Sequence, residues 1–289
     1  MKLNIRGYFS APPRLSGNLT TILYLLILIP GMAIAQQECR IVPDVIYGHK
    51  SGMALTYDVF QPDSSNGAGI IHLVSGSWIS RYMEPDSVLE NYQPLLDQGY
   101  TVFALRHSSS PKFTVPEEAD DVKQGAWHIY HNSYKFGVDS TRLGIFGGSS
   151  GGHLSLVAGL SGDSHPVRAI VAFFPPVDMR NLPDFLKKMI PALDFDTTLA
   201  ASVSPILLAS PDDPPTLLIH GDKDFVVDVS QSQKMYEVLQ QNNVVSNLII
   251  YEGMPHGNSY GAKGKYYEQA TAEMIAWFRK YLIDKDLKE

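Results

Sequence analysis

The sequence predicts an α/β protein with a mostly parallel, eight-stranded sheet, helices on both faces and a small helical insertion. Beyond residue 40, short apolar runs alternate with helix-length amphipathic segments, and the later runs are apolar throughout. Strands that are buried on both faces have such continuous apolar runs. The alternation of strands and helices favours parallel strands joined by helices that pack on both sides of the sheet.

Eight segments are expected to be strands. Residues 42–47 and 53–60 are predicted to form an antiparallel pair at the start of the domain. Six further strand-like runs lie at 69–75, 100–106, 142–147, 167–174, 216–220 and 247–253.

The segments between these runs have helical periodicity. Ala119, Val122, Ala126 and Ile129 recur on one face of such a segment. The connection between the strands that end at Phe174 and begin at Thr216 is much longer than a single crossover helix requires. We expect a small helical insertion there, roughly at residues 176–212, as a candidate lid.

Composition limits the partners and the chemistry. The net charge of the 289-residue chain is -7, so we expect no nucleic acid partner, because phosphate binding needs a basic face. Cys39 is the only cysteine and cannot form an internal disulfide. No Cys/His spacing indicates a zinc site. The expected chemistry needs no metal and no cofactor.

The N-terminus resembles an export signal. A basic leader precedes an apolar run at 22–30, and the small residues at 33–35 suit cleavage before Gln36. We therefore expect a signal peptide at 1–35, a mature domain at 36–289, and a periplasmic or secreted protein. The apolar run is shorter than the roughly 20 residues that span a bilayer, so no stable membrane insertion is expected after cleavage. A retained N-terminal membrane anchor is the alternative.

The stretch GIFGGSSGGHLSL, residues 144–156, indicates a strand, a sharp turn and a helix. A nucleophilic serine at such a turn needs very small residues two positions before and two positions after it, hence G-x-S-x-G. The pattern fits twice, centred on Ser149 and on Ser150, and the residues alone leave both alternatives open. In either case the following helix begins with unpaired N–H groups that suit an oxyanion.

A nucleophilic serine needs an acid and a base, which in this type of fold follow it along the chain in the order serine, acid, histidine. Two later strand ends offer such residues. One strand is followed by Asp222, Asp224 and Asp228, and the next by a loop with His256. Parallel strands bring these loops to the same edge of the sheet. His256 is the best candidate among nine histidines, because its Gly/Pro-bounded loop gives a structural histidine little to pack against.

At these motifs the chain resembles the α/β-hydrolase superfamily, specifically the bacterial carboxylesterase branch with hormone-sensitive-lipase-like and feruloyl-esterase-like proteins. The motifs GGSSGGHLSL, LLIHGDKDFVVDVSQS and GMPHG carry the resemblance, which extends from residues 55–62 to the last helix. It implies that Ser149 is the nucleophile and Ser150 the residue after it. It also implies that Asp224 and His256 complete a catalytic triad.

The chain departs from this family at one loop. The family usually has an HGGGW-like sequence after the third strand, whose N–H groups help to bind the oxyanion, whereas this chain has VSGSW at 74–78. The resemblance implies an oxyanion hole formed by the N–H groups of Gly76, Ser77 and Ser150. Glycine allows closer backbone approach, so we expect the altered loop to change the shape of the pocket.

The expected function is hydrolysis of carboxylic esters through an acyl-enzyme. The expected substrate is a small molecule with small acyl or aryl ester groups, such as those on carbohydrates. Trp78 and His107 are candidate pocket residues. Two alternatives remain: a serine exopeptidase similar to prolyl-oligopeptidase catalytic domains, and a hydrolase-fold protein that binds without catalysis.

Overall fold

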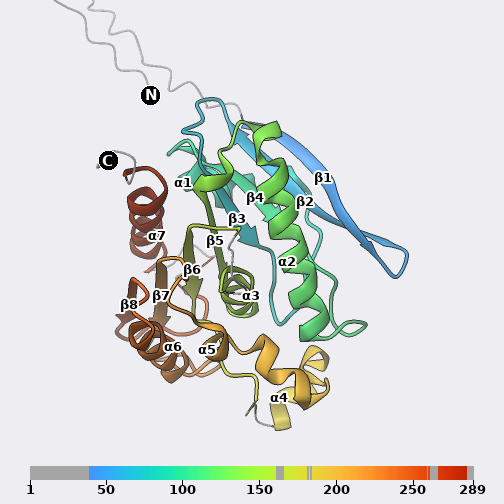
Figure 1. Ribbon diagram of the computed structural model, residues 1–289, viewed down its shortest axis with the longest axis vertical. Coiled ribbons are helices and arrows are strands. Elements are labelled where there is room, and N and C mark those ends of the chain that lie inside the picture. Colours follow the sequence, from blue (N-terminus) through green and yellow to red (C-terminus); the bar gives the residue numbers. More distant parts are fainter. Residues whose placement is uncertain are drawn as a thin grey trace, which may run out of the picture. The chain divides into compact units, whose positions relative to one another are not determined.

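An eight-stranded sheet forms the centre of the structure, with the strand order β1-β2-β4-β3-β5-β6-β7-β8 (Figure 1). The structure is a computed structural model, and it describes residues 39–160, 166–180, 182, 184–258, 260 and 266–284. These residues all belong to one compact unit, residues 37–289. The predicted signal peptide at 1–35 lies outside the described residues.

The first part of the sheet is antiparallel and the rest is parallel. β1 pairs antiparallel with β2, and β2 with β4, whereas every other neighbouring pair is parallel. The predicted eight-stranded, mostly parallel sheet is thereby confirmed. The strands are β1 (Cys39–Lys50), β2 (Met53–Pro62), β3 (Gly69–Leu73), β4 (Thr101–Leu105), β5 (Leu143–Gly148), β6 (Ala169–Phe173), β7 (Thr216–Gly221) and β8 (Ser246–Tyr251).

Helices cover both faces of the sheet. Buried side chains of α2, α3 and α6 share one hydrophobic cluster, and those of α1 and α7 share a second cluster on the opposite face (Figure 1). These helices are α1 (Pro85–Leu96), α2 (Val115–Asn132), α3 (Ser150–Gly159), α6 (Ser230–Gln241) and α7 (Tyr267–Leu282). No helix in the described ranges has the length and apolar content to cross a bilayer.

The long connection between β6 and β7 contains only short helices. They are α4 (Asp184–Met189), the 3-10 helices η3 (Pro191–Leu193) and η4 (Thr197–Val203), and α5 (Pro205–Leu208). Two more 3-10 helices, η1 (Ser133–Phe136) and η2 (Ser140–Arg142), precede β5. The first group lies within the helical insertion expected at 176–212, and its function as a lid stays a prediction.

The sequence pattern explains how α2 and α3 pack. The four α2 residues expected on one helical face, Ala119, Val122, Ala126 and Ile129, are fully buried. Every residue of α3 is buried, so this helix has no solvent-facing side. A fully buried helix directly after β5 fixes the turn between them, and this turn carries the candidate nucleophile.

Candidate active site

Ser149 lies at the turn between β5 and α3, in a backbone conformation that residues other than glycine rarely adopt. Its φ is 55° and its ψ is -121°. A Cβ atom added to Gly147 would lie 2.4 Å from the carbonyl carbon of Gly151, so the turn leaves no space for a side chain two positions before the serine. Strained backbone of this kind occurs at functional sites and requires support from the surrounding structure.

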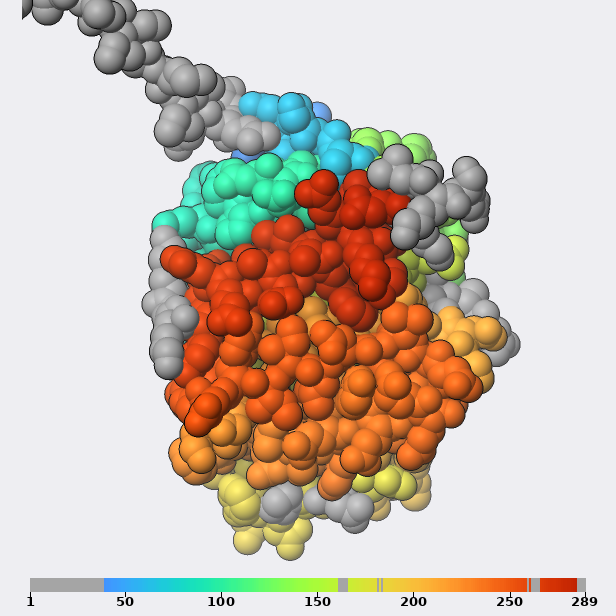
Figure 2. Space-filling view, turned by 90° about the vertical axis from the view of Figure 1, so that its left-hand side faces the viewer, coloured from blue at the N-terminus to red at the C-terminus, as the bar shows by residue number. Residues whose placement is uncertain are grey.

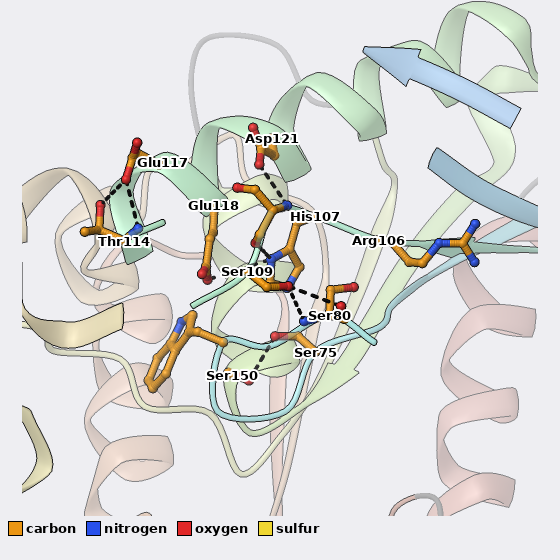
Figure 3. Close-up of polar contacts among 12 residues, drawn as sticks. Ser75, Ser80, Arg106, His107, Ser109, Thr114, Glu117, Glu118, Asp121 and Ser150 are labelled. Atoms are coloured by element: carbon orange, nitrogen blue, oxygen red, sulfur yellow. Dashed lines mark hydrogen bonds and ion pairs between the residues drawn. The ribbon is translucent and has the colours of Figure 1, made fainter. Parts of the chain in front are cut away.

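Ser150 is less suited than Ser149 to act as a nucleophile, because of its position in the helix and its burial. It is the first residue of α3 and is fully buried. Its hydroxyl lies 3.0 Å from the hydroxyl of Ser75, as Figure 3 shows. Of the two registers that the residues left open, the structure places the strained turn at Ser149.

One imidazole joins the three candidate triad residues. His256 Nδ1 lies 2.7 Å from Asp224 Oδ2, and His256 Nε2 lies 3.2 Å from Ser149 Oγ. With Nδ1 donating to the carboxylate, Nε2 carries the lone pair that accepts the serine proton. The His256 side chain is 23% exposed and that of Asp224 is 1% exposed, so the acid is buried behind a base that a substrate can reach.

The Asp224 carboxylate is stabilised as an anion. Burial alone would raise its pKa, but hydrogen bonds from His220, His256 and the Val227 amide outweigh burial and hold the pKa well below its ordinary value. Its Oδ1 accepts the N–H groups of Val226 and Val227 at 2.9 and 2.8 Å. The carboxylate can therefore orient the imidazole and stabilise its cation.

His220 is a support for Asp224 that the sequence analysis did not identify. Its Nε2 lies 2.9 Å from the Val227 carbonyl oxygen and 3.3 Å from Asp224 Oδ2, while its Nδ1 lies 2.7 Å from the Ser232 hydroxyl. These partners assign the proton to Nε2, because both of its neighbours are acceptors. The four-residue separation of His220 and Asp224 around the β7 turn was the signal that could have revealed the contact.

Phe174 is a second contact that the sequence did not predict. Its ring centroid lies 4.6 Å from that of His256, so it supports the imidazole from one side. Its φ is 38°, which is unfavourable for an aromatic residue. The residue follows β6 directly, and its amide donates to the Ile219 carbonyl oxygen of β7 at 2.7 Å.

The oxyanion loop, defined here as residues 75–80, forms a two-residue turn. Gly76 and Ile79 exchange two backbone hydrogen bonds of 3.1 and 3.0 Å, and Ser77 and Trp78 have φ values of 51° and 57°. The expectation that Gly76 donates to an oxyanion is therefore not met, because its N–H group already donates to Ile79. No described residue accepts the N–H group of Ser77.

The two candidate pocket residues lie in the interior instead of on a pocket wall. Trp78 is 5% exposed and packs within the core on the α2 and α3 side of the sheet. The His107 side chain is buried beside Glu118, and Figure 3 shows it between α2 and the oxyanion loop. Trp78 lies within the turn of the oxyanion loop, and His107 lies two residues after the end of β4.

A cavity of about 150 Å³ lies on the α1 and α7 side of the sheet. Figure 2 views the molecule from this side, with the red segment of α7 beside the cyan-green segment that contains α1. The cavity is largely apolar and is lined in part by His72, Tyr92 and Tyr260. The Tyr92 hydroxyl contacts His72 Nδ1, and the Tyr260 hydroxyl contacts His72 Nε2. Burial lowers the pKa of His72 to about 4, so its imidazole is neutral.

The described residues contain no group of three or more His, Cys, Asp or Glu side chains that could hold a metal ion. The site offers a hydrogen-bonded serine, histidine and aspartate together with backbone N–H groups. This set suits transfer of an acyl group to serine, because it contains a nucleophile, a general base and donors for the oxyanion.

The chain is similar in sequence to known esterases. The chain is 29% identical over 234 residues to the esterase LipC of Mycobacterium tuberculosis (strain ATCC 25618 / H37Rv), covering 72% of this chain and 57% of LipC. It is 24% identical over 260 residues to the esterase LipQ of the same organism, covering 81% of this chain and 61% of LipQ. The chain thus spans about 60% of the length of the curated relatives it matches.

Solved structures share the fold. A truncated carbohydrate esterase from gut microbiota superposes with a TM-score of 0.69 at 25% identity, covering 85% of this chain and 98% of that one. The Est2 esterase of Thermogutta terrifontis superposes with a TM-score of 0.70 at 17% identity, covering 86% and 94%. The sequence model of the BD-FAE family matches residues 57–239. The chain, with its α/β-hydrolase fold, therefore belongs to the BD-FAE family.

Proposed function

We propose that the protein is a serine carboxylesterase that hydrolyses small acyl or aryl esters, such as those carried by carbohydrates. The observation that carries the proposal is the single imidazole of His256, hydrogen-bonded to Asp224 on one side and to Ser149 on the other. Family membership and the likeness to a carbohydrate esterase support it. Est2, which shares the fold, has been solved with propionate and with butyrate bound, so short-acyl esters are the first substrates to test.

The reaction proceeds in two steps. Ser149 Oγ bonds to the ester carbonyl carbon while His256 Nε2 takes the serine proton, and the developing oxyanion accepts the N–H groups of Ser77 and Ser150. Collapse of this intermediate breaks the bond to the alcohol, which leaves with the proton from His256. Water then attacks the acyl-enzyme with His256 as base, which releases the acid and restores the Ser149 hydroxyl.

The decisive experiment is labelling with a fluorophosphonate probe, which reacts only with an activated serine. We expect an adduct on Ser149 in the folded protein, assigned by fragmentation of the peptide that contains both Ser149 and Ser150. Heat-denatured protein and the His256→Ala variant are the controls and should not react. An adduct on Ser150, or none on folded protein, would contradict the mechanism, and the latter would favour the binding function.

A substrate panel separates the proposal from the exopeptidase alternative. p-Nitrophenyl acetate, acetylated xylo-oligosaccharides and methyl ferulate represent the ester classes, and aminoacyl p-nitroanilides represent the peptidase class. We expect ester hydrolysis that is lost in Ser149→Ala. Release of p-nitroaniline at a higher kcat/KM than p-nitrophenol would reverse the assignment.

The proposal includes export of the mature protein beginning at Gln36. A small-x-small pattern at 33–35 after an apolar run supports it. N-terminal sequencing of protein recovered outside the cytoplasm is the test. Recovery of the full-length chain in the membrane fraction would instead support the N-terminal anchor.

A further inference from the structure

We propose that His153 is a positioning residue that holds the oxyanion loop in its active conformation through the side chain of Trp78. This inference rests on the proposed function, because it concerns the donor geometry for the same acyl transfer. The residue lies on α3, four positions after the candidate nucleophile, and its side chain hydrogen-bonds to Trp78 and Val203 rather than to a triad side chain. Its hydrogen bonds instead join three separate parts of the chain.

The need for an anchor arises from the turn itself. Ser77 and Trp78 both have left-handed backbone conformations, with φ of 51° and 57°. Residues with a Cβ disfavour this region, whereas glycine enters it freely. Two hydrogen bonds between Gly76 and Ile79 close the turn, but they do not fix its direction relative to Ser149. A loop of this kind persists only when its surroundings hold it in place.

Trp78 provides that attachment. Its indole Nε1 donates to His153 Nδ1 at 3.2 Å, and the two ring centroids are 5.6 Å apart in an edge-on arrangement. Its carbonyl oxygen accepts the amide of Ser110 at 3.2 Å. Because Ser77 directly precedes Trp78, a rotation of the indole would move the Ser77 N–H group, which the proposed mechanism assigns to the oxyanion.

His153 is itself held rigidly. Its backbone amide donates to the Ser149 carbonyl oxygen at 2.9 Å, so its position is tied to the nucleophile turn. Its Nε2 donates to the Val203 carbonyl oxygen in η4 at 2.8 Å. This donation leaves Nδ1 as the acceptor for the indole, so only the neutral imidazole satisfies both partners. Burial lowers the pKa of His153 to about 4, which keeps the ring neutral at the pH of the assays.

Two substitutions of His153 test the inference. His153→Leu removes both hydrogen bonds at similar volume, whereas His153→Asn keeps an amide oxygen near the position of Nδ1. We expect His153→Leu to lower kcat for p-nitrophenyl acetate about 10- to 100-fold with KM nearly unchanged, which is less than the loss of a whole oxyanion donor. The affinity for a trifluoromethyl ketone inhibitor should fall by the same factor, and His153→Asn should have a smaller effect.

The Ser77→Gly substitution supplies a rescue. Glycine adopts the required φ without strain, so the turn in the double variant Ser77→Gly/His153→Leu should depend less on the anchor, and at least part of the lost kcat should return. The matched control is Ser155→Ala. This removes a buried hydroxyl from the same helix, which donates to the Gly151 carbonyl oxygen at 2.8 Å, and it should leave kcat unchanged.

A direct readout checks the hydrogen bond independently of activity. The chain has three tryptophans, so three indole N–H resonances are expected in a proton–nitrogen correlation spectrum. One of them should shift in folded His153→Leu and stay in place in Ser155→Ala. Failure of the wild-type protein to react with the probe or to hydrolyse any ester would contradict the proposed function. An active wild type with a folded His153→Leu variant within twofold of its kcat, or an impaired variant that Ser77→Gly does not rescue, would overturn the inference about His153.

Discussion

Glu118 provides the sharpest test of the electrostatics, because it is a fully buried carboxyl group without a hydrogen-bonding partner among the described residues. It lies on α2, and its Oε2 is 3.7 Å from His107 Nδ1 (Figure 3). Burial raises the pKa of Glu118 from its ordinary value near 4.5 to about 9. The perturbation is Glu118→Gln, which keeps the shape of the side chain and removes the ionisation.

The magnitude follows from the difference between the folded and unfolded pKa values. Between about pH 4.5 and 9 the unfolded chain ionises Glu118, whereas the folded protein keeps the proton. The contribution of this group to stability is complete below that window and is lost as pH rises through it, by about 1.4 kcal/mol per pH unit. From pH 6 to pH 8 the glutamine variant should therefore gain about 2.7 kcal/mol of unfolding free energy relative to wild type.

Urea denaturation followed by tryptophan fluorescence at pH 6, 7 and 8 measures this difference. All other titrating groups are shared by the two proteins, so their contributions cancel. The matched control is Glu117→Gln at the neighbouring position. Slight burial would raise the pKa of Glu117, but two hydrogen bonds from Thr114 outweigh it and lower the pKa, so the control difference should not change with pH.

A difference between wild type and Glu118→Gln that stays constant from pH 6 to pH 8 would refute the reasoning. It would mean that Glu118 is ionised in the folded protein over this range. Its charge would then need a cationic partner, such as a protonated His107, whose Nδ1 lies 3.7 Å from Glu118 Oε2.

Three further predictions concern the site. Asp224→Asn should lower kcat about 10⁴-fold with intact folding, because an amide cannot hold His256 in the tautomer that accepts the serine proton; steady-state kinetics with p-nitrophenyl acetate measures this. His220→Gln should lower kcat only about 10- to 100-fold, as expected for losing one hydrogen bond to a charged group, and an effect as large as that of Asp224→Asn would contradict its supporting role. Gly147→Ala should destabilise the fold by about 3 kcal/mol and abolish probe labelling, because the new Cβ would lie 2.4 Å from Gly151; unchanged urea denaturation would show that the turn is less crowded than described.

The sheet could be predicted from the sequence because burial on both faces leaves a clear apolar signature. The 69–75 and 216–220 runs correspond to β3 and β7, and the expected antiparallel start corresponds to β1 and β2. The candidate triad was equally accessible, since each of its residues follows a strand that ends at the same edge. The choice between Ser149 and Ser150 was not accessible from the residues, because both registers satisfy the same glycine pattern.

The oxyanion loop was the least predictable part of the site. Its sequence lacks two of the glycines that make a left-handed turn easy, so local preference argues against the conformation found at Ser77 and Trp78. Because the two neighbouring glycines are missing, the sequence made Gly76 the obvious N–H donor to the oxyanion. The structure instead uses this N–H group to close the turn with Ile79. Tertiary contacts with His153 and Ser110, which are distant in sequence, decide the conformation here.

Glu118, His153 and His220 show where prediction from sequence stops. Glu118 lies three residues after Val115 and four before Val122, so helical periodicity alone places it on the buried face of α2. His153 and His220 lie within equally buried elements. Periodicity therefore predicts that a polar side chain is buried, but its partner comes from another element, such as Trp78 or Val203 for His153. For His153 and His220 the fold identifies these partners, whereas Glu118 is buried without a hydrogen-bonding partner among the described residues.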